Sequence, residues 1–354
     1  MGCSRAVICC GSTLARPGSP LDAVRAALGS RGAGVFSGVR AHSPLPAVEA
    51  AAAALKECAA DVVIAVGGGS AIVTARAASI LSAEGGDPRA LCTRPDGRGG
   101  LHSPKLLAPK LPQLVVPTTP TTAIVKAGSA MLDPETHARL ALFDPKTRVQ
   151  AVFIDPAMLE SAPRELLLSA SLNTLTLAIE GLLSRSGDPI ADALLMHAVR
   201  LLVSRLPQIA TSDDSSVRSD LMLASILAGQ GSDYTGAGMA IPLGHAVGAK
   251  FQVDNGITDA IVLPHVMRFN ASAATAGFEK LAAALALASP SAVVPTIEAL
   301  FAKLNVPRRL RDIGVNQASI AELAAVTMDD WFLKSNPRRV ESAMEVQRLL
   351  GEAW

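Results

Sequence analysis

The sequence predicts an α/β domain over residues 1–158 and an all-helical domain over residues 159–354. In the first part, short apolar runs alternate with helical segments, the pattern of a parallel sheet covered by helices. One apolar run leads directly into the glycine sequence GGGS at 67–70. After Pro163 the periodicity is helical, with few strand signals. With 354 residues, of which 49% are hydrophobic, the chain is long enough to bury two cores.

The elements of the first part are expected to alternate along the chain. The run DVVIAV at 61–66 is apolar throughout, as in a strand buried on both faces, and Pro46 suits the first turn of an alanine-rich helix. From the N-terminus, the expected strands are residues 6–10, 35–36, 61–66, 113–117, 140–143 and 149–154, and the expected helices are residues 21–28, 44–59 and 71–82. Residues 84–112 are expected to form a solvated loop or, alternatively, one that attracts an acidic substrate through Arg89, Arg94, Arg98, Lys105 and Lys110.

Composition excludes several classes of function. The net charge is +1 and no dense Lys/Arg block occurs, so we expect neither nucleic acid nor a membrane surface as a partner. No apolar run approaches the roughly 20 residues that a membrane span needs. Five cysteines, two of them adjacent and none in a CxxC pair, argue against a disulfide framework. We therefore expect a cytoplasmic protein that acts on a small molecule.

A strand followed by GGGS and then a helix provides the backbone geometry of an anion-binding site. Glycines let the backbone approach a phosphate, and the helix N-terminus favours negative charge. Gly67, Gly68, Gly69 and Ser70 are therefore candidates for binding a nucleotide. The motif differs from GxGxxG because Ile72 stands at its third glycine, and a tight turn without ligand has the same pattern.

Several segments, taken in order, resemble one family. DVVIAVGGGS, LPQLVVPTT, FIDP, LNTLTLAIEGLLS and GHAVGAKFQVDNG…AIVLPHVMRFN occur along the chain. The chain is thereby similar to the iron-containing alcohol dehydrogenases, especially their maleylacetate reductase branch. The resemblance implies a nucleotide-binding α/β domain, an all-helical domain and an active-site cleft between them. It also implies a homodimer, and adds Thr118 and Thr119 of the PTT loop to the candidate nucleotide contacts.

The resemblance implies a divalent metal held by one Asp and three His. A DxxxH pair on one helix face supplies two ligands, and these positions hold Asn173 and Leu177 here. The other two positions hold Ile241 and Asn255. Leucine and isoleucine have no lone pair to offer, and neutral amides are poor ligands for iron or zinc. We therefore predict no metal, and expect Leu177 and Ile241 to line a substrate pocket.

The cofactor side of the resemblance also departs from the family. The acid expected after GGGS is missing at Val73, and the glycines of the PTT loop are replaced. Relative to the family, the chain is expected to be about twenty residues short between Gly11 and Val35, with the family's first helix and second strand deleted. The end of the second strand usually holds the adenosine ribose through an acid. From this shortened domain we expect no cofactor, with NAD(P)H as the alternative.

His245 is the main catalytic candidate, because it matches the family's active-site histidine that is not a metal ligand. Imidazole titrates near neutral pH and can donate or accept a proton. A buried structural histidine is the alternative interpretation. The amides of Asn173 and Asn255 can hydrogen-bond a substrate carbonyl, or satisfy each other. Tyr234 and Asp254 lie nearby in sequence and are further candidates, although such residues are more often surface or capping groups.

Three functions fit these observations. The first is a metal-free enzyme that carries out a non-redox reaction, such as cyclisation, pericyclic addition, isomerisation or dehydration, on an apolar unsaturated molecule, through pre-organisation in a dry cavity. We place this one first, in specialised metabolism. The second is a metal-independent NAD(P)H-dependent reductase of the maleylacetate reductase type. The third is a binding or scaffold protein without catalysis.

Overall fold

The computed structural model describes residues 2–96, 101–136, 138–212 and 214–354. The chain forms two compact units, one ending at Ala162 and one beginning at Pro163. The boundary expected after residue 158 falls inside helix α4 (Pro156–Glu160), which belongs to the first unit. The division therefore comes at Pro163, a residue that cannot continue a hydrogen-bonded helix from α4.

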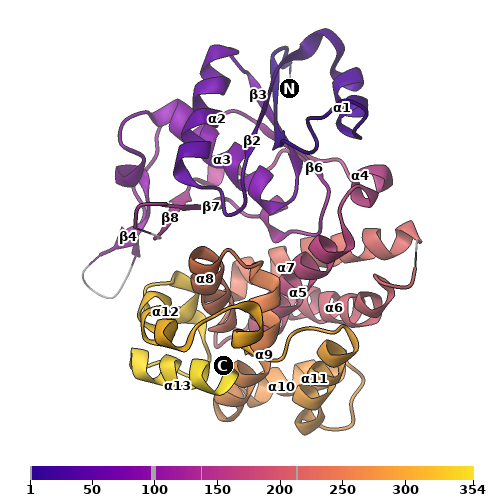
Figure 1. Ribbon diagram of the computed structural model, residues 1–354, viewed down its shortest axis with the longest axis vertical. Coiled ribbons are helices and arrows are strands. Elements are labelled where there is room, and N and C mark those ends of the chain that lie inside the picture. The colour runs from indigo at the N-terminus through magenta and orange to yellow at the C-terminus, as the bar shows by residue number, and fades with distance from the viewer. Residues whose placement is uncertain (1, 97–100, 137, 213) are drawn as a thin grey trace. The chain divides into compact units, whose positions relative to one another are not determined.

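The first unit is built on a parallel five-stranded sheet with the order β2-β1-β3-β6-β9 (Figure 1). The core under this sheet comes from the expected apolar runs, with Ile8, Ile64 and Val66 at most 4% exposed. The strands are β1 (Ala6–Gly11), β2 (Gly32–Val39), β3 (Val62–Gly67), β6 (Gln113–Pro117) and β9 (Ala151–Val152), and the helices are α1 (Leu21–Leu28), α2 (Leu45–Glu57), α3 (Gly69–Glu84) and α4.

The expectation of a deleted second strand is wrong. Strand β2 covers eight residues rather than the two expected at 35–36, because the glycines on either side of that pair, which have low strand propensity, also belong to it. It pairs in parallel with β1, and β3 pairs with the other side of β1. A second strand of a nucleotide-binding fold lies beside the first. The β1–α1–β2–α2–β3 unit is therefore complete, and the domain is not shortened there.

Two small antiparallel sheets complete the first unit. Strand β8 (Arg139–Phe143) was expected, but it pairs with β7 (Gly128–Leu132), which was not, and lies outside the parallel sheet. The expected strand at 149–154 is reduced to the two residues of β9. The segment expected to be a loop contains the two-residue strands β4 (Arg94–Pro95) and β5 (Leu101–His102).

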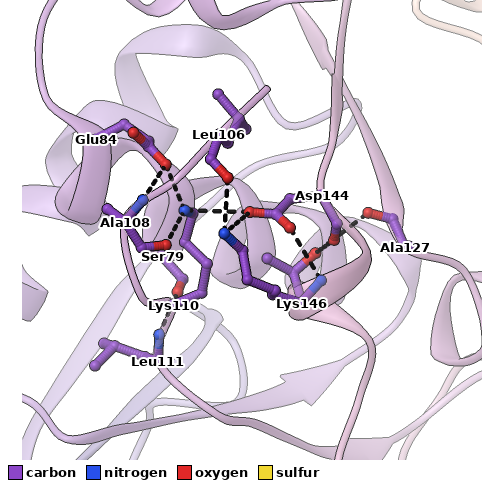
Figure 2. A network of polar contacts seen from close by, with 10 residues as sticks. Ser79, Glu84, Leu106, Ala108, Lys110, Leu111, Ala127, Asp144 and Lys146 are labelled. Atoms are coloured by element: carbon purple, nitrogen blue, oxygen red, sulfur yellow. Dashed lines mark hydrogen bonds and ion pairs between the residues drawn. The ribbon is translucent and has the colours of Figure 1, made fainter. Parts of the chain in front are cut away.

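A buried ion-pair network ties this segment to helix α3 and to the turn after β8 (Figure 2). The Nζ atom of Lys110 lies 2.6 Å from Glu84 of α3 and 3.1 Å from Asp144, and its side chain is fully buried. Lys146 donates to the carbonyl of Leu106 at 2.7 Å. Two basic residues of the expected solvated loop are therefore neutralised by acids: Lys110 by Glu84 and Asp144, and Arg89 by Asp133. Arg98 lies outside the described residues. The network fixes the chain immediately before β6, whose end carries Thr118.

The second unit is helical, as expected. Its helices are α5 (Arg164–Leu183), α6 (Pro189–Arg205), α7 (Ser215–Thr235), α8 (Ala240–Phe251), α9 (Asn255–Asn270), α10 (Thr275–Ala284), α11 (Val293–Lys303), α12 (Ile320–Met328) and α13 (Ala343–Ala353), coloured from magenta to yellow in Figure 1. Helix α5 is long and apolar enough to cross a membrane, alone among the helices described. However, 78% of its most apolar stretch is buried in the unit, so its apolar surface is already used in packing.

Candidate functional site

The glycine turn joins β3 to α3 at the carboxyl end of the sheet. It lies where the strand order reverses, because β2 and β3 flank β1 on opposite sides, and ligands bind at such a switch point in open α/β sheets. A Cβ on Gly68 would lie 2.7 Å from the hydroxyl oxygen of Thr119, and one on Gly69 would lie 3.0 Å from that of Thr121. Gly67 has a φ of +143°, which L side chains rarely adopt. A side chain at Gly67 would strain the backbone, and one at Gly68 or Gly69 would press on a threonine hydroxyl.

The start of α3 suits a phosphate group. No side chain caps its N-terminus and no acid lies in its first turn. The backbone N–H groups and dipole of such a terminus attract anions. Thr118 and Thr119 are buried beside the turn, so the structure brings together the sequence-predicted nucleotide contacts of this unit. These residues fit the diphosphate group of a dinucleotide.

The end of β2 shows what the adenosine side of a nucleotide would meet. The strand ends in Ser37-Gly38-Val39 and is followed by Arg40, with no acid in this stretch. Arg40 is exposed, and its guanidinium donates to the carbonyl of Val39 at 3.3 Å. An acid at this place binds the ribose 2′-hydroxyl of NAD, whereas an Arg accommodates the 2′-phosphate of NADP. The residues present fit the phosphate better than the hydroxyl.

In the second unit, two of the four implied ligand positions form an apolar cluster. Leu177 of α5 and Ile241 of α8 are 4% and 3% exposed, and they pack together with Ala237. Phe332 packs against the same cluster. The two positions predicted to line a substrate pocket therefore do come together, in a cluster separate from the main helical core.

The two amide positions lie on α5 and at the start of α9. The amide of Asn173 donates to the buried carboxylate of Asp259 at 2.6 Å. Helix α9 reaches α5 directly, because a Cβ on Gly256 would lie 1.8 Å from the carbonyl oxygen of Ser169. The side-chain oxygen of Asn255 is buried and accepts no hydrogen bond from the described residues. Asn173 and Asn255 thus lie close together, but Asn173 already donates to a carboxylate rather than to its fellow amide.

A divalent metal does not fit these four positions. Leu177 and Ile241 offer carbon only, and Asn173 points its N–H₂ group at Asp259. Within the described part of the chain, no three His, Cys, Asp or Glu side chains gather as metal ligands would. Iron and zinc sites need anionic or imidazole ligands.

A buried carboxylate fixes the start of α8. Glu180, one turn after Leu177 on α5, accepts hydrogen bonds from the backbone N–H groups of Gly238, Ala240 and Ile241 at 3.0, 2.6 and 3.2 Å. Burial raises the pKa of Glu180 to about 7, against the lowering effect of these hydrogen bonds. The terminus that would otherwise attract an anion is already occupied by this side chain.

His245 lies on α8, one turn beyond Ile241. Its Nδ1 atom is 2.8 Å from the carboxylate of Asp330, and the two side chains are only 10% and 8% exposed. Its ring lies 6.2 Å, centroid to centroid, from the ring of Phe332. The apolar cluster and the histidine therefore share a neighbour. Sequence reasoning missed Asp330 and Phe332, because no motif links residues about 85 positions apart.

Tyr234 and Asp254 occupy the positions typical of surface and capping residues. Tyr234 is in the last turn of α7 and is 58% exposed. Asp254 is the exposed N-cap residue of α9, although its side chain makes no capping hydrogen bond. Their catalytic roles stay predictions. His265 lies on α9, and partial burial lowers the pKa of its imidazole.

Comparison with known proteins gives the family. A family model described as "Iron-containing alcohol dehydrogenase" matches residues 1–156, and one described as "Fe-containing alcohol dehydrogenase family, C-terminal" matches residues 167–354. The lactaldehyde reductase of Escherichia coli K12 is 28% identical over 332 residues, which cover 90% of this chain and 84% of that protein. The maleylacetate reductase of Sphingobium indicum is 29% identical over 351 residues, 98% and 88% of the two chains.

Solved structures agree on the fold. An alcohol dehydrogenase from Oenococcus oeni superposes with a TM-score of 0.91 at 23% identity, covering 100% of this chain and 93% of that one. The sulfoacetaldehyde reductase of Bifidobacterium kashiwanohense, solved with NAD⁺, gives a TM-score of 0.87 at 20% identity, with 100% and 92% covered. The family models together account for nearly all of both units, so this chain belongs to the iron-containing alcohol dehydrogenase family.

Proposed function

We propose that this protein is a metal-independent, NADPH-dependent reductase of a carbonyl compound or of a conjugated acid of the maleylacetate kind. The glycine turn carries this proposal, because it leaves an uncapped helix terminus at the switch point of the sheet. The relatives named above are reductases, which supports the same reaction class. This places the reductase ahead of the non-redox reaction that the missing metal ligands had favoured.

Without a metal, a polar side chain has to stabilise the charge that develops on the substrate oxygen. Bound NADPH would supply the hydride. His245, protonated on both ring nitrogens, would donate its Nε2 proton to the oxygen as it gains negative charge, and would be left as the neutral Nδ1–H form, still hydrogen-bonded to Asp330. The products are then NADP⁺ and an alcohol or, from a conjugated acid, NADP⁺ and the compound reduced at its carbon–carbon double bond, and the protein regains its proton from solvent. Leu177 and Ile241 would contact the apolar part of the substrate.

Preference for NADPH follows from the end of β2. With Arg40 there and no acid, the 2′-phosphate gains a cation, and NADH loses its usual carboxylate partner. Fluorescence titration with both nucleotides tests this preference. We expect a micromolar Kd for NADPH and binding at least about tenfold weaker for NADH, a difference of about 1.4 kcal/mol. Arg40→Ala should remove the difference, and Arg31→Ala, an exposed arginine before the same strand, should leave it unchanged.

The non-redox reaction remains a second candidate because of the apolar cluster. Three apolar side chains and Phe332 gather where the family resemblance places metal ligands, which suits an apolar unsaturated substrate. A titration in which neither nucleotide binds at millimolar concentration would refute the reductase and leave this candidate. Metal analysis of the purified protein is the companion test, since one equivalent of tightly held iron or zinc would contradict both proposals.

A further inference from the structure

Asp330 is the side chain that the sequence did not reveal, and its two oxygens have different partners. Oδ2 lies 2.8 Å from Nδ1 of His245 on α8. Oδ1 accepts the backbone N–H of Phe332 at 3.0 Å and so caps the 3₁₀ turn Trp331–Ser335. One carboxylate therefore fixes both the histidine and the turn that carries its aromatic neighbour.

This contact determines which ring nitrogen can act. An ionised carboxylate only accepts hydrogen bonds, so Nδ1 of His245 has to carry the proton in the pair. A carboxylate on one nitrogen sets the tautomer and orientation of an imidazole, and chemistry with a substrate then goes through the other nitrogen. Because the two side chains are only 10% and 8% exposed, water competes little for this bond.

Two buried acids therefore act on the same helix. Glu180 holds the N-terminus of α8 through three backbone N–H groups, and Asp330 holds the side chain one turn further on. Phe332 covers the apolar cluster beside them. Glu180 thus holds the backbone at the start of α8, and Asp330 orients the imidazole that this helix carries.

We infer that Asp330 is a positioning residue, which keeps Nδ1 of His245 protonated both before and after proton transfer, so that Nε2 is the nitrogen that gives its proton to the reacting group. Its effect on turnover rests on the proposed reduction, but its effect on the ring does not. Asp330→Asn keeps an acceptor oxygen for the backbone N–H of Phe332 but presents an N–H₂ donor, in place of an acceptor, to Nδ1 of His245. Asp330→Ser keeps the N-cap, because serine is a good capping residue, and cannot reach the ring. Asp329→Asn, the same change at the exposed neighbour, is the matched control.

The first measurement is ¹H–¹⁵N correlation spectroscopy of the histidine rings in the full chain, with His245→Gln to assign the signal. At a pH at which the ring is neutral, wild type and Asp329→Asn should show the single ring proton on Nδ1 of His245. Asp330→Asn and Asp330→Ser should show it on Nε2, or a mixture of both forms. An unchanged Nδ1–H form in a folded Asp330→Ser protein would overturn the inference. If Asp330→Asn does not fold, Asp330→Ser alone decides.

The second measurement is NADPH oxidation with lactaldehyde and with maleylacetate as probes. Loss of the orienting carboxylate should lower kcat about a hundredfold, within the usual range for general acid catalysis, and change KM less than about threefold. An unchanged kcat in folded Asp330→Ser would overturn the catalytic part. If wild type oxidises no NADPH with either probe, the proposed function fails in this assay, and the ring spectrum still decides on Asp330.

Discussion

Removal of the Glu180 carboxyl group should destabilise the helical unit strongly. In Glu180→Ala, three backbone N–H groups at the start of α8 lose their acceptor, and the replacement leaves a cavity. The side chain is 1% exposed, so water cannot easily replace it. The cost comes from buried donors left without partners, which is the expensive way to lose a hydrogen bond.

The magnitude follows from the three contacts. An unsatisfied buried donor costs about 1–3 kcal/mol, and three at the lower value give about 3 kcal/mol. The cavity adds to this, so we expect Glu180→Ala to lose about 3–5 kcal/mol. This comparison belongs at about pH 4, below the ordinary pKa of 4.5, where the carboxyl is mostly protonated in the folded and in the unfolded protein and folding does not have to protonate it.

Urea unfolding followed by circular dichroism measures this loss as a change in the free energy of unfolding. Glu165→Ala is the matched control, since Glu165 is exposed in the first turn of the same helix. It should change the free energy by less than about 0.5 kcal/mol. A Glu180→Ala protein within 1 kcal/mol of wild type, by the same measurement, would refute the claim that this carboxyl anchors α8.

Three further predictions concern the charge, the turn and the metal. Burial raises the pKa of Glu180 from 4.5 to about 7, so the stability that this side chain contributes is complete below pH 4.5 and is lost as the pH rises through 7. Relative to Glu180→Gln, the unfolding free energy of wild type should fall by about 3 kcal/mol between those pH values. A difference between the two proteins that does not change with pH would contradict the raised pKa. Gly68→Ala should weaken NADPH binding at least about tenfold, because its Cβ would lie 2.7 Å from the hydroxyl of Thr119; Gly351→Ala, which meets nothing within 4 Å, is the control, and equal Kd values would exclude a nucleotide at the turn. The four implied metal ligands are restored by Asn173→Asp, Leu177→His, Ile241→His and Asn255→His. The variant should hold one equivalent of zinc by metal analysis. Stoichiometric zinc in wild type would contradict the prediction that these four positions bind no metal.

Much of the fold could be predicted because local patterns set it. Apolar runs without alternation marked the buried strands β1, β3 and β6, and the change to helical periodicity after Pro163 marked the second unit. Strand β2 was underestimated, since its glycines have low strand propensity and its extent depends on pairing with β1. The missed strand β7 likewise exists through its pairing with β8.

The sequence by itself determined the composition of the site: a glycine turn after a strand, a single central histidine, and carbon and amide groups where the family resemblance implies metal ligands. Only the tertiary structure decided the partners. It brought Asp330 to His245, Glu180 to the start of α8, and Asp259 to Asn173. Residue identity is read from the chain, but a hydrogen bond between helices depends on how those helices pack, which no local pattern encodes.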